Sequence, residues 1–153
     1  MTELTFRGEY DYAVDDRGRT LLPPSFKAAL TETVVIGRGA EGQLWIYPRA
    51  TFEQRLEQMQ QASDEAQNGD FETGLRFWLA AQEVMFDKQG RLAIPGLMRK
   101  QAGINSSVIV VGNGDRVELW NPDRYEQSYS EWVADYKDHR DNYAAMRKAG
   151  LRP

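Results

Sequence analysis

Hydrophobic and polar residues alternate near the start of the chain in the way expected of a half-buried strand. Tyr10, Tyr12 and Val14 fall on one face of this segment, and acidic or small residues fall on the other. Gly18 follows in a polar turn, where glycine is free to adopt a positive φ angle. A second strand is predicted at 19–22, where a proline stops it. We therefore predict two strands joined by a short loop.

The pattern then predicts a helix, two strands and a longer helix. A proline suits the first turn of a short helix over 24–30. The apolar run at 33–36 predicts a buried strand, and a glycine-rich turn separates it from another strand at 43–47. Over 48–66, apolar residues recur at steps of three and four among charges, which indicates an amphipathic helix.

The rest of the chain repeats this order of elements. A polar segment at 63–73 leads into a short helix, and a strand is predicted around 84–86. A helix over 95–102 ends at a glycine, and further strands are predicted at 108–111 and 116–120. An Asn-Pro pair then begins one long helix. Its apolar stripe consists of Tyr125, Tyr129, Trp132, Tyr136, Tyr143 and Met146.

One stretch of the sequence occurs twice. Residues 14–23 read VDDRGRTLLP and residues 86–95 read FDKQGRLAIP, so an aspartate, a glycine, an arginine and a proline recur at the same spacing 72 residues later. A self-match at long period indicates an internal repeat. One half alone would bury little apolar surface. We therefore predict an α+β fold in which two tandem strand-loop-strand-helix-strand-strand-helix halves interlock about a pseudo-twofold axis.

Composition narrows the possible chemistry. The 153 residues include no cysteine and one histidine, which excludes disulfides, thiolate metal sites and histidine-rich metal centres, and we expect no cofactor. The longest aliphatic run, at 108–111, is far too short to cross a bilayer, and the first residues do not resemble a signal peptide. We expect a cytoplasmic protein without a membrane partner.

The sequence offers little for catalysis. Asp15 and Asp16 are adjacent, so on an extended chain their carboxylates point to opposite sides and cannot share a substrate proton. Without cysteine, and with His139 in a charged helix, neither a nucleophilic triad nor histidine acid–base chemistry is expected. The glycine-rich segments at 37–39 and 112–114 join predicted strands, which favours hairpin turns over phosphate-binding loops. We predict that the chain is not an enzyme.

The repeated loop is the strongest candidate for a function. Arg17 and Arg19 flank the glycine of the first copy, and Lys88 and Arg91 flank that of the second. A narrow hairpin tip with cations can enter the major groove of DNA, where arginine binds guanine through two hydrogen bonds and lysine neutralises phosphate. The net charge of −4 does not favour DNA binding by itself, so the cations would have to be concentrated on one face.

A structural role for the same residues is the alternative. Asp15 can pair with Arg19, and Asp87 with Arg91, either to orient the guanidinium groups or merely to tie the turns. Spacing alone slightly favours the second role. The aromatic stripe of the last helix favours a core or a subunit interface over base stacking, and the cations of the C-terminal tail favour a solvated end.

These motifs together resemble the MraZ family. The resemblance rests on Phe6-Arg7-Gly8, on the two Asp-x-x-Gly-Arg motifs with their prolines and on the segment 108–120, and it covers residues 4–130. It implies two AbrB-like swapped-hairpin halves that interlock as a pseudo-twofold barrel with peripheral helices. The implied parts are a first AbrB-like repeat at 5–62, a linker and short helix at 63–80, a second repeat at 81–127 and a C-terminal helix and tail at 128–153.

The resemblance also implies a function. It implies a bacterial transcriptional regulator, usually a repressor, that assembles as a closed homo-oligomeric ring. Such a ring binds short direct repeats upstream of the division and cell-wall gene cluster, and a nucleoid-associated location follows. The implied contacts to double-stranded DNA are Arg17, Arg19, Lys88, Arg91 and Arg7. The implied loop-shaping residues are Asp15, Gly18, Asp87 and Gly90.

Two departures from the family pattern bear on base preference. Asp16 lies where an acid weakens the attraction to phosphate, and Gln89 precedes the glycine of the second loop. The alternative function is a ring-forming protein-interaction scaffold without DNA readout. Salt dependence separates the two, because phosphate neutralisation makes DNA affinity fall steeply with salt.

Overall fold

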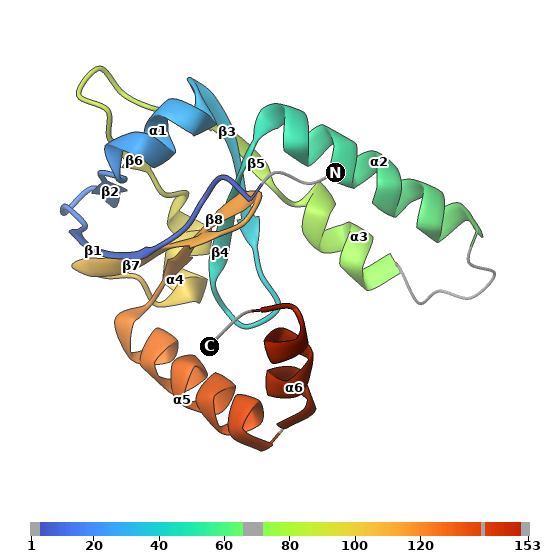
Figure 1. Ribbon diagram of the computed structural model, residues 1–153. Helices are drawn as coiled ribbons and strands as arrows, with labels where there is room; N and C mark the ends of the chain where they lie inside the picture. Colours follow the sequence, from blue (N-terminus) through green and yellow to red (C-terminus); the bar gives the residue numbers. More distant parts are fainter. Residues whose placement is uncertain (1–3, 66–71, 139, 151–153) are drawn as a thin grey trace. The chain divides into compact units, whose positions relative to one another are not determined.

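The computed structural model describes residues 4–65, 72–138 and 140–150, and these fold into eight strands and six helices (Figure 1). Residues 1–121 and 122–153 form two compact units, each described by itself. The elements are β1 (Glu9–Ala13), β2 (Arg19–Thr20), α1 (Pro24–Leu30), β3 (Thr33–Arg38), β4 (Leu44–Pro48), α2 (Arg49–Glu65), α3 (Glu72–Leu79), β5 (Gln82–Met85), β6 (Leu92–Ala93), α4 (Gly96–Ala102), β7 (Ser107–Asn113), β8 (Arg116–Trp120), α5 (Pro122–Asp138) and α6 (Arg140–Lys148).

The first unit is built on a six-stranded antiparallel sheet in the order β1-β7-β8-β4-β3-β5. Strand pairing joins the two halves of the repeat, because β1 lies beside β7 and β5 lies beside β3. Strands β1–β4 of the first half correspond in order to β5–β8 of the second half. Exchanging each strand for its counterpart gives β5-β3-β4-β8-β7-β1, which is the observed order read from the other end. The two halves therefore interlock through their strands, as the repeat predicted.

The predicted closed barrel is not confirmed. Within the described residues, β1 and β5 stand at the two ends of the strand order, so the six-stranded sheet is open. The short strands β2 and β6 form a separate two-stranded ladder, with Arg19 opposite Ala93 and Thr20 opposite Leu92. The strand predicted over 19–22 is thus only two residues long, because Leu22 turns into the core and α1 begins two residues later.

The main core lies between one face of the sheet and helices α1 and α4. Alternate residues of β3, such as Val34 and Ile36, point into this core, as the period of two along a strand requires. Leu30 of α1 and Met98 of α4 are almost completely buried there, and burial of such a side chain stabilises the fold by roughly 1.5–3 kcal/mol. Since α1 and α4 come from different halves, one core depends on both.

A second apolar cluster covers the other face of the sheet. It combines Val35, Trp45 and Tyr47 from β3 and β4 with Phe52 of α2, and Trp78 of α3 packs against it. The ring centroids of Trp45 and Trp78 lie 5.0 Å apart. Helices α2 and α3 are therefore held on this face by packed aromatic rings, with Phe52 of α2 stacked on Trp78 of α3.

The C-terminal segment differs from its prediction. One long helix was expected from Pro122 onward, but the structure has two, α5 and α6. The Tyr136 hydroxyl donates to the Met146 sulfur over 2.6 Å, whereas ten residues of continuous helix would separate their backbones by about 15 Å. Tyr136 and Met146 therefore do not lie on one straight helix, and the prediction of one helix was wrong. Tyr143 of the predicted stripe lies outside the described side chains. No described helix is both long and apolar enough to traverse a bilayer.

Candidate functional site

Loop one (Asp15–Arg19) is closed by the side chain of its own aspartate. The Oδ1 atom of Asp15 accepts hydrogen bonds from the backbone N–H groups of Arg17 and Arg19 at 3.0 and 2.8 Å. The Oδ2 atom accepts one from Nε of Arg19 at 2.7 Å. Gly18 adopts a φ angle of 75°, which lets the chain reverse within the loop. One carboxylate thus fixes both the backbone and the arginine.

Loop two (Asp87–Arg91) has the same construction. Asp87 accepts from the backbone N–H groups of Gln89 and Arg91 at 3.0 and 2.8 Å and from Nε of Arg91 at 2.8 Å. Gly90 has a φ angle of 78°. Each distance matches its counterpart in loop one within 0.1 Å. The geometry therefore follows from the Asp-x-x-Gly-Arg spacing rather than from surroundings peculiar to one half.

Electrostatics hold both aspartates in the charged form. The backbone N–H of Arg19 is the largest influence that lowers the pKa of Asp15, and the arginine side chain adds to it, while partial desolvation opposes them. The same groups of Arg91 lower the pKa of Asp87. Both carboxylates are therefore ionised at neutral pH, and each holds its guanidinium in one orientation.

The fold places the two loops side by side. The backbone N–H of Ile94 donates to the carbonyl oxygen of Gly18 at 3.0 Å, which extends the β2–β6 ladder to loop one. Nη1 of Arg91 lies 3.9 Å from Oδ2 of Asp15, so an arginine of loop two also faces the acid of loop one. Two loops that lie 72 positions apart in the sequence therefore share one electrostatic site.

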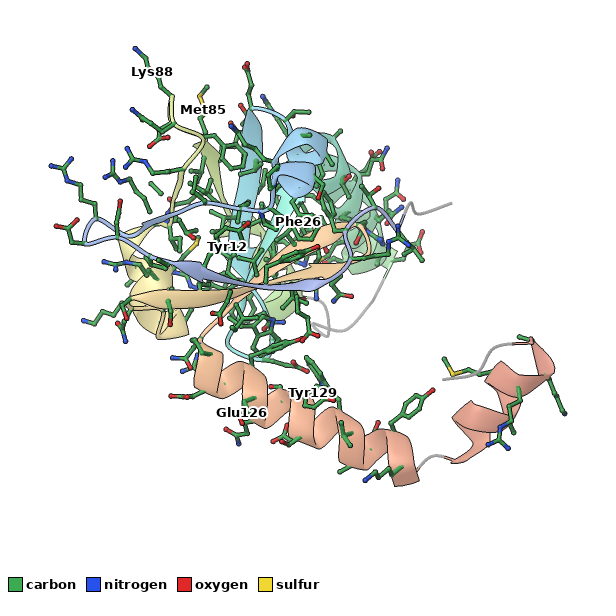
Figure 2. The ribbon with its side chains drawn as sticks, turned by 60° about the vertical axis from the view of Figure 1, so that its left-hand side comes forward. Tyr12, Phe26, Met85, Lys88, Glu126 and Tyr129 are labelled. Carbon is green, nitrogen blue, oxygen red and sulfur yellow. The ribbon has the colours of Figure 1, made fainter. Side chains whose placement is uncertain are left out.

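The loop cations differ in exposure. Arg17 and Lys88 are exposed at the loop tips, and Lys88 extends away from the ribbon (Figure 2). The side chains of Arg19 and Arg91 are 25% and 31% exposed, and each uses its Nε atom to bind its own aspartate. Arg19 and Arg91 therefore do stabilise their turns through hydrogen bonds to the aspartates. Part of each guanidinium nevertheless remains open to solvent.

Arg7 lies away from the loops. The Gly112 N–H donates to Gly8 at one end of the β1–β7 ladder, and the Val14 N–H donates to Ser106 at the other end. At about 3.4 Å per residue, these ends are ~20 Å apart. Arg7 stands beside the first end and loop one follows the second, so the structure does not bring this residue together with the others.

Two cations beside the loops were missed by the sequence analysis. Arg99 of α4 lies against loop one, because a methyl group placed on Gly18 would come within 2.8 Å of its Nε atom. Lys27 of α1 lies against loop two in the same way, next to Gly90. Lys27 and Arg99 each follow the loop arginine of their own half by eight residues, and this shared spacing is the signal that could have found them.

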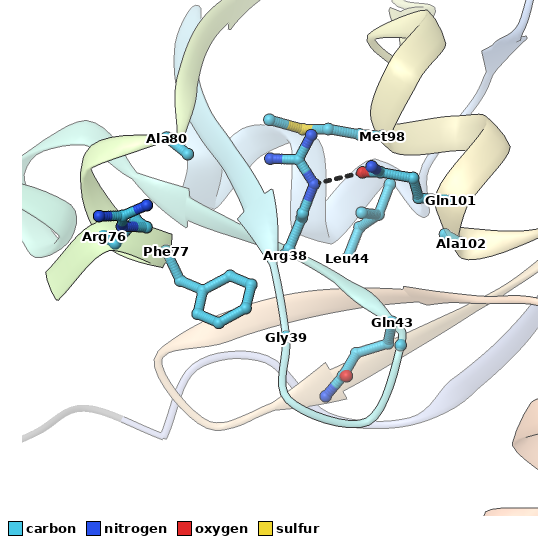
Figure 3. A pocket seen from close by; sticks show the side chains of 11 residues that line it. Arg38, Gly39, Gln43, Leu44, Arg76, Phe77, Ala80, Met98, Gln101 and Ala102 are labelled. Atoms are coloured by element: carbon cyan, nitrogen blue, oxygen red, sulfur yellow. Dashed lines mark hydrogen bonds between the residues drawn. The ribbon is translucent and has the colours of Figure 1, made fainter. Parts of the chain in front are cut away.

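A cavity of about 440 Å³ lies elsewhere in the first unit (Figure 3). The β3–β4 turn, α3 and α4 line it, and within it Nε of Arg38 donates to Gln101 at 2.6 Å. Phe77 and Met98 contribute apolar surface. The described lining includes no carboxylate, imidazole, hydroxyl or thiol, so this cavity supplies no general acid, general base or nucleophile. In the described part of the chain, no three His, Cys, Asp or Glu side chains are grouped to hold a metal ion.

Comparison with known proteins agrees with the repeated architecture. The sequence profile of the family described as "MraZ protein, putative antitoxin-like" matches residues 5–71 and 77–146. The two matched segments together cover most of the chain, and each contains one of the two loops.

Individual relatives are similar over nearly their whole length. The "Transcriptional regulator MraZ" of Pediococcus pentosaceus is 34% identical over 141 residues, which cover 90% of this chain and 95% of the relative. The protein of the same name from Kineococcus radiotolerans is 36% identical, over 89% of this chain and 94% of the relative. The one from Deinococcus radiodurans is 35% identical, over 78% and 83%. With the family profile matched in both halves and these relatives aligned along most of their length, the chain belongs to the MraZ family.

Proposed function

We propose that the protein is a sequence-specific DNA-binding transcriptional regulator and not an enzyme. The observation that carries this proposal is the placement of two matching arginine-bearing loops side by side, each with its arginine fixed by an aspartate. The printed names of the relatives, "Transcriptional regulator MraZ", support the same conclusion.

The loop geometry suits recognition of base edges. An arginine that binds a carboxylate through Nε retains further N–H groups on its terminal nitrogens, and these can donate to guanine O6 and N7. Each such pair contributes about 1–3 kcal/mol of discrimination between bases. Arg19 and Arg91 take this role in our proposal, whereas the exposed Arg17 and Lys88 contact the DNA from the loop tips. Asp15, Gly18, Asp87 and Gly90 shape the loops.

Arg7 has a peripheral role in this proposal. It is exposed at the end of β1 that lies away from the loops. It would therefore contact DNA only where the bound duplex extends past the loops. Replacing Arg7 with alanine should therefore weaken binding much less than replacing Arg19 or Arg91.

We further propose that the protein acts as a closed homo-oligomeric ring of interlocked swapped-hairpin barrels. Adjacent subunits on direct repeats would gain affinity through effective concentration, on the order of 10²- to 10⁴-fold. A ring needs a head-to-tail interface. Phe77 and Leu79 of α3 are 46% and 65% exposed, and Tyr129 and Trp132 of α5 are 56% and 41% exposed, which makes both helices candidates for that interface.

The remaining parts of the proposal concern its cellular context. The ring would repress the division and cell-wall gene cluster by binding promoter direct repeats, at the nucleoid in the cytoplasm. In this scheme residues 5–62 and 81–127 are the two DNA-binding repeats, 63–80 link them and 128–153 form the C-terminal helix and tail. The alternative is a ring-forming protein-interaction scaffold without DNA readout, which the exposed aromatic residues of α5 also suit.

The test is binding to duplex DNA from upstream of the protein's own gene, measured against salt concentration. We expect retention with a steep negative salt slope, loss of specific binding in Arg19→Ala and Arg91→Ala, and little change in Arg49→Ala, which removes an exposed cation of α2. If the protein does not bind the duplex, or binds it with an affinity that does not change with salt, the scaffold function is favoured. Loss of folding in the loop variants would show that their arginines are only structural.

A further inference from the structure

Each loop has a cation from the other half of the molecule beside it. Arg99 belongs to α4 of the second half and lies against Gly18 of loop one. Lys27 belongs to α1 of the first half and lies against Gly90 of loop two. The two residues occupy equivalent positions in the repeat, so the contact is made twice by the same geometry.

The contacts require the glycines to lack a side chain. A methyl group on Gly18 would lie 2.8 Å from Nε and 3.1 Å from Cζ of Arg99, so the guanidinium lies directly on the loop backbone. On the other side, Lys27 passes its stem along the loop, and its Nζ atom also lies 5.8 Å from the ring centre of Phe86. Both cations therefore lie against a loop backbone, Lys27 with its side chain exposed and Arg99 half-buried.

Neither cation is neutralised within the fold. Among the described residues, no carboxylate lies within 4.0 Å of Arg99 or Lys27, whereas Arg19, Arg91 and Arg116 each have an acidic partner. The two loops alone hold four cations and three acids, a formal charge of +1. With Lys27 and Arg99 the formal charge of the site becomes +3. A chain with a net charge of −4 thus concentrates positive charge at this face.

We propose that Arg99 and Lys27 are DNA phosphate contacts that complete the loops across the repeat, Arg99 serving loop one and Lys27 serving loop two. This inference rests on the proposed function. They lie on helices that flank Gly18 and Gly90 and are not part of the loops themselves, which suits the phosphates that flank a groove rather than the base edges inside it. Each DNA-contacting unit is then built from both halves of the chain.

The test uses the full-length protein with Lys27→Met, Arg99→Met and the double variant. Methionine keeps an unbranched apolar stem and removes the charge. Binding is measured against salt on two duplexes, one from upstream of the protein's own gene and one of the same length with scrambled sequence. Arg49→Met is the matched control, because it removes one exposed cation from α2, outside both loops. Arg99→Lys keeps the charge, and melting temperatures monitor folding.

Phosphate contacts are independent of sequence, so each methionine variant should weaken binding to both duplexes by a similar factor. The slope of log affinity against log salt should become shallower by about 1 for each phosphate-neutralising cation removed. Arg99→Lys should keep most of the slope, and Arg49→Met should bind like the wild-type protein.

The outcomes separate this inference from the function on which it rests. If the wild-type protein shows no salt-dependent retention of either duplex, the proposed function fails. If the wild type binds but the double variant keeps its affinity and slope, the helix cations are not contacts and this inference alone is overturned. A selective loss on the upstream duplex, with the scrambled duplex unaffected, would also overturn it, because the residues would then be reading bases. If a methionine variant melts much lower, binding is compared at a temperature well below its melting point, where affinity and slope equal to those of the wild type overturn the inference and a shallower slope on both duplexes supports it.

Discussion

Nη1 of Arg91 lies 3.9 Å from Oδ2 of Asp15, while Nε of the same guanidinium donates to Asp87 at 2.8 Å. One arginine of loop two therefore faces the acids of both loops. Asp15 correspondingly faces two arginines, its own Arg19 at 2.7 Å and Arg91 across the site. The two loops are electrostatically coupled, and the coupling is centred on Asp15.

This asymmetry predicts that Asp15→Asn impairs specific DNA binding more than Asp87→Asn. Asparagine keeps an oxygen that can accept from the backbone N–H groups but loses the charge that orients the guanidinium groups. We expect the ratio of specific to nonspecific affinity to fall in both variants and further in Asp15→Asn. Gel-shift titrations on an upstream duplex and a scrambled duplex measure this ratio. Equal losses in the two variants would show that the 3.9 Å approach has no energetic weight.

The loss of folding stability at acid pH should depend partly on the same two aspartates, Asp15 and Asp87. Their pKa values in the fold are lower than the ordinary value of about 3.9. A lowered pKa adds stability that is fully present above the ordinary value and is lost as the pH falls through the lowered pKa. The melting-temperature difference between the wild type and the Asp15→Asn, Asp87→Asn double variant should therefore shrink as the pH is lowered from about 5 to about 2.

The backbone amide of Arg19 provides a direct readout of that titration, because it donates to the Asp15 carboxylate. Its NMR chemical shift should follow the protonation of Asp15 with a midpoint below about 3.9. The Arg91 amide should do the same for Asp87. Midpoints at or above the ordinary value would contradict the described loop geometry.

Gly18→Ala should both strain loop one and displace Arg99. A φ angle of 75° costs a residue with a Cβ atom roughly 1–2 kcal/mol, and the new methyl group would press on the guanidinium. We expect lower stability by about that amount together with weaker DNA binding. Gly96→Ala is the matched control, since nothing lies within 4 Å of its added methyl group. Urea unfolding and duplex titration of both variants check this, and equal behaviour of the two would contradict both expectations.

Arg116→Met should destabilise the fold without touching the loops. Glu118 is only 4% exposed, and its carboxylate accepts from Trp120 at 3.0 Å and pairs with Arg116 at 2.6 Å. Leaving that carboxylate buried without its cation costs about 3–5 kcal/mol. Gln43 precedes Leu44-Trp45 in the first half as Glu118 precedes Leu119-Trp120 in the second, so the equivalent position holds a neutral glutamine. Adding Glu118→Gln to Arg116→Met should therefore restore most of the loss. Urea unfolding of the single and double variants measures both steps.

Much of the site was predictable because its geometry is local. Asp15 and Arg19 are four residues apart, a separation that one turn closes, so their pairing and the positive φ angle of Gly18 follow from neighbouring residues. The end of α4 was predictable for the same reason, since Gly103 adopts the left-handed conformation with a φ angle of 68°. Because the motif recurs at 87–91, the same pairing and turn could be predicted for the second half.

What depends on long-range packing could not be predicted. The approach of Arg99 to Gly18 requires β2 to pair with β6, and no local pattern specifies which short strands meet. The division of the C-terminal segment into α5 and α6 was missed because the aromatic spacing continues through both helices. The separation of Arg7 from the loops appears only when β1 is seen to run its full length beside β7.

The crossed pairing of strands has a consequence for biosynthesis. While the first half leaves the ribosome, the neighbours of β1, β2 and the outer edge of β3 have not yet been made, since they are β7, β6 and β5. The core around α1 and β3 cannot be completed until β7, at Ser107–Asn113, has emerged, because Val108 and Val110 belong to it. Such a nascent chain exposes apolar surface during most of its translation, and exposed apolar surface favours aggregation. We therefore expect the first unit to complete its folding only after both halves have been synthesised.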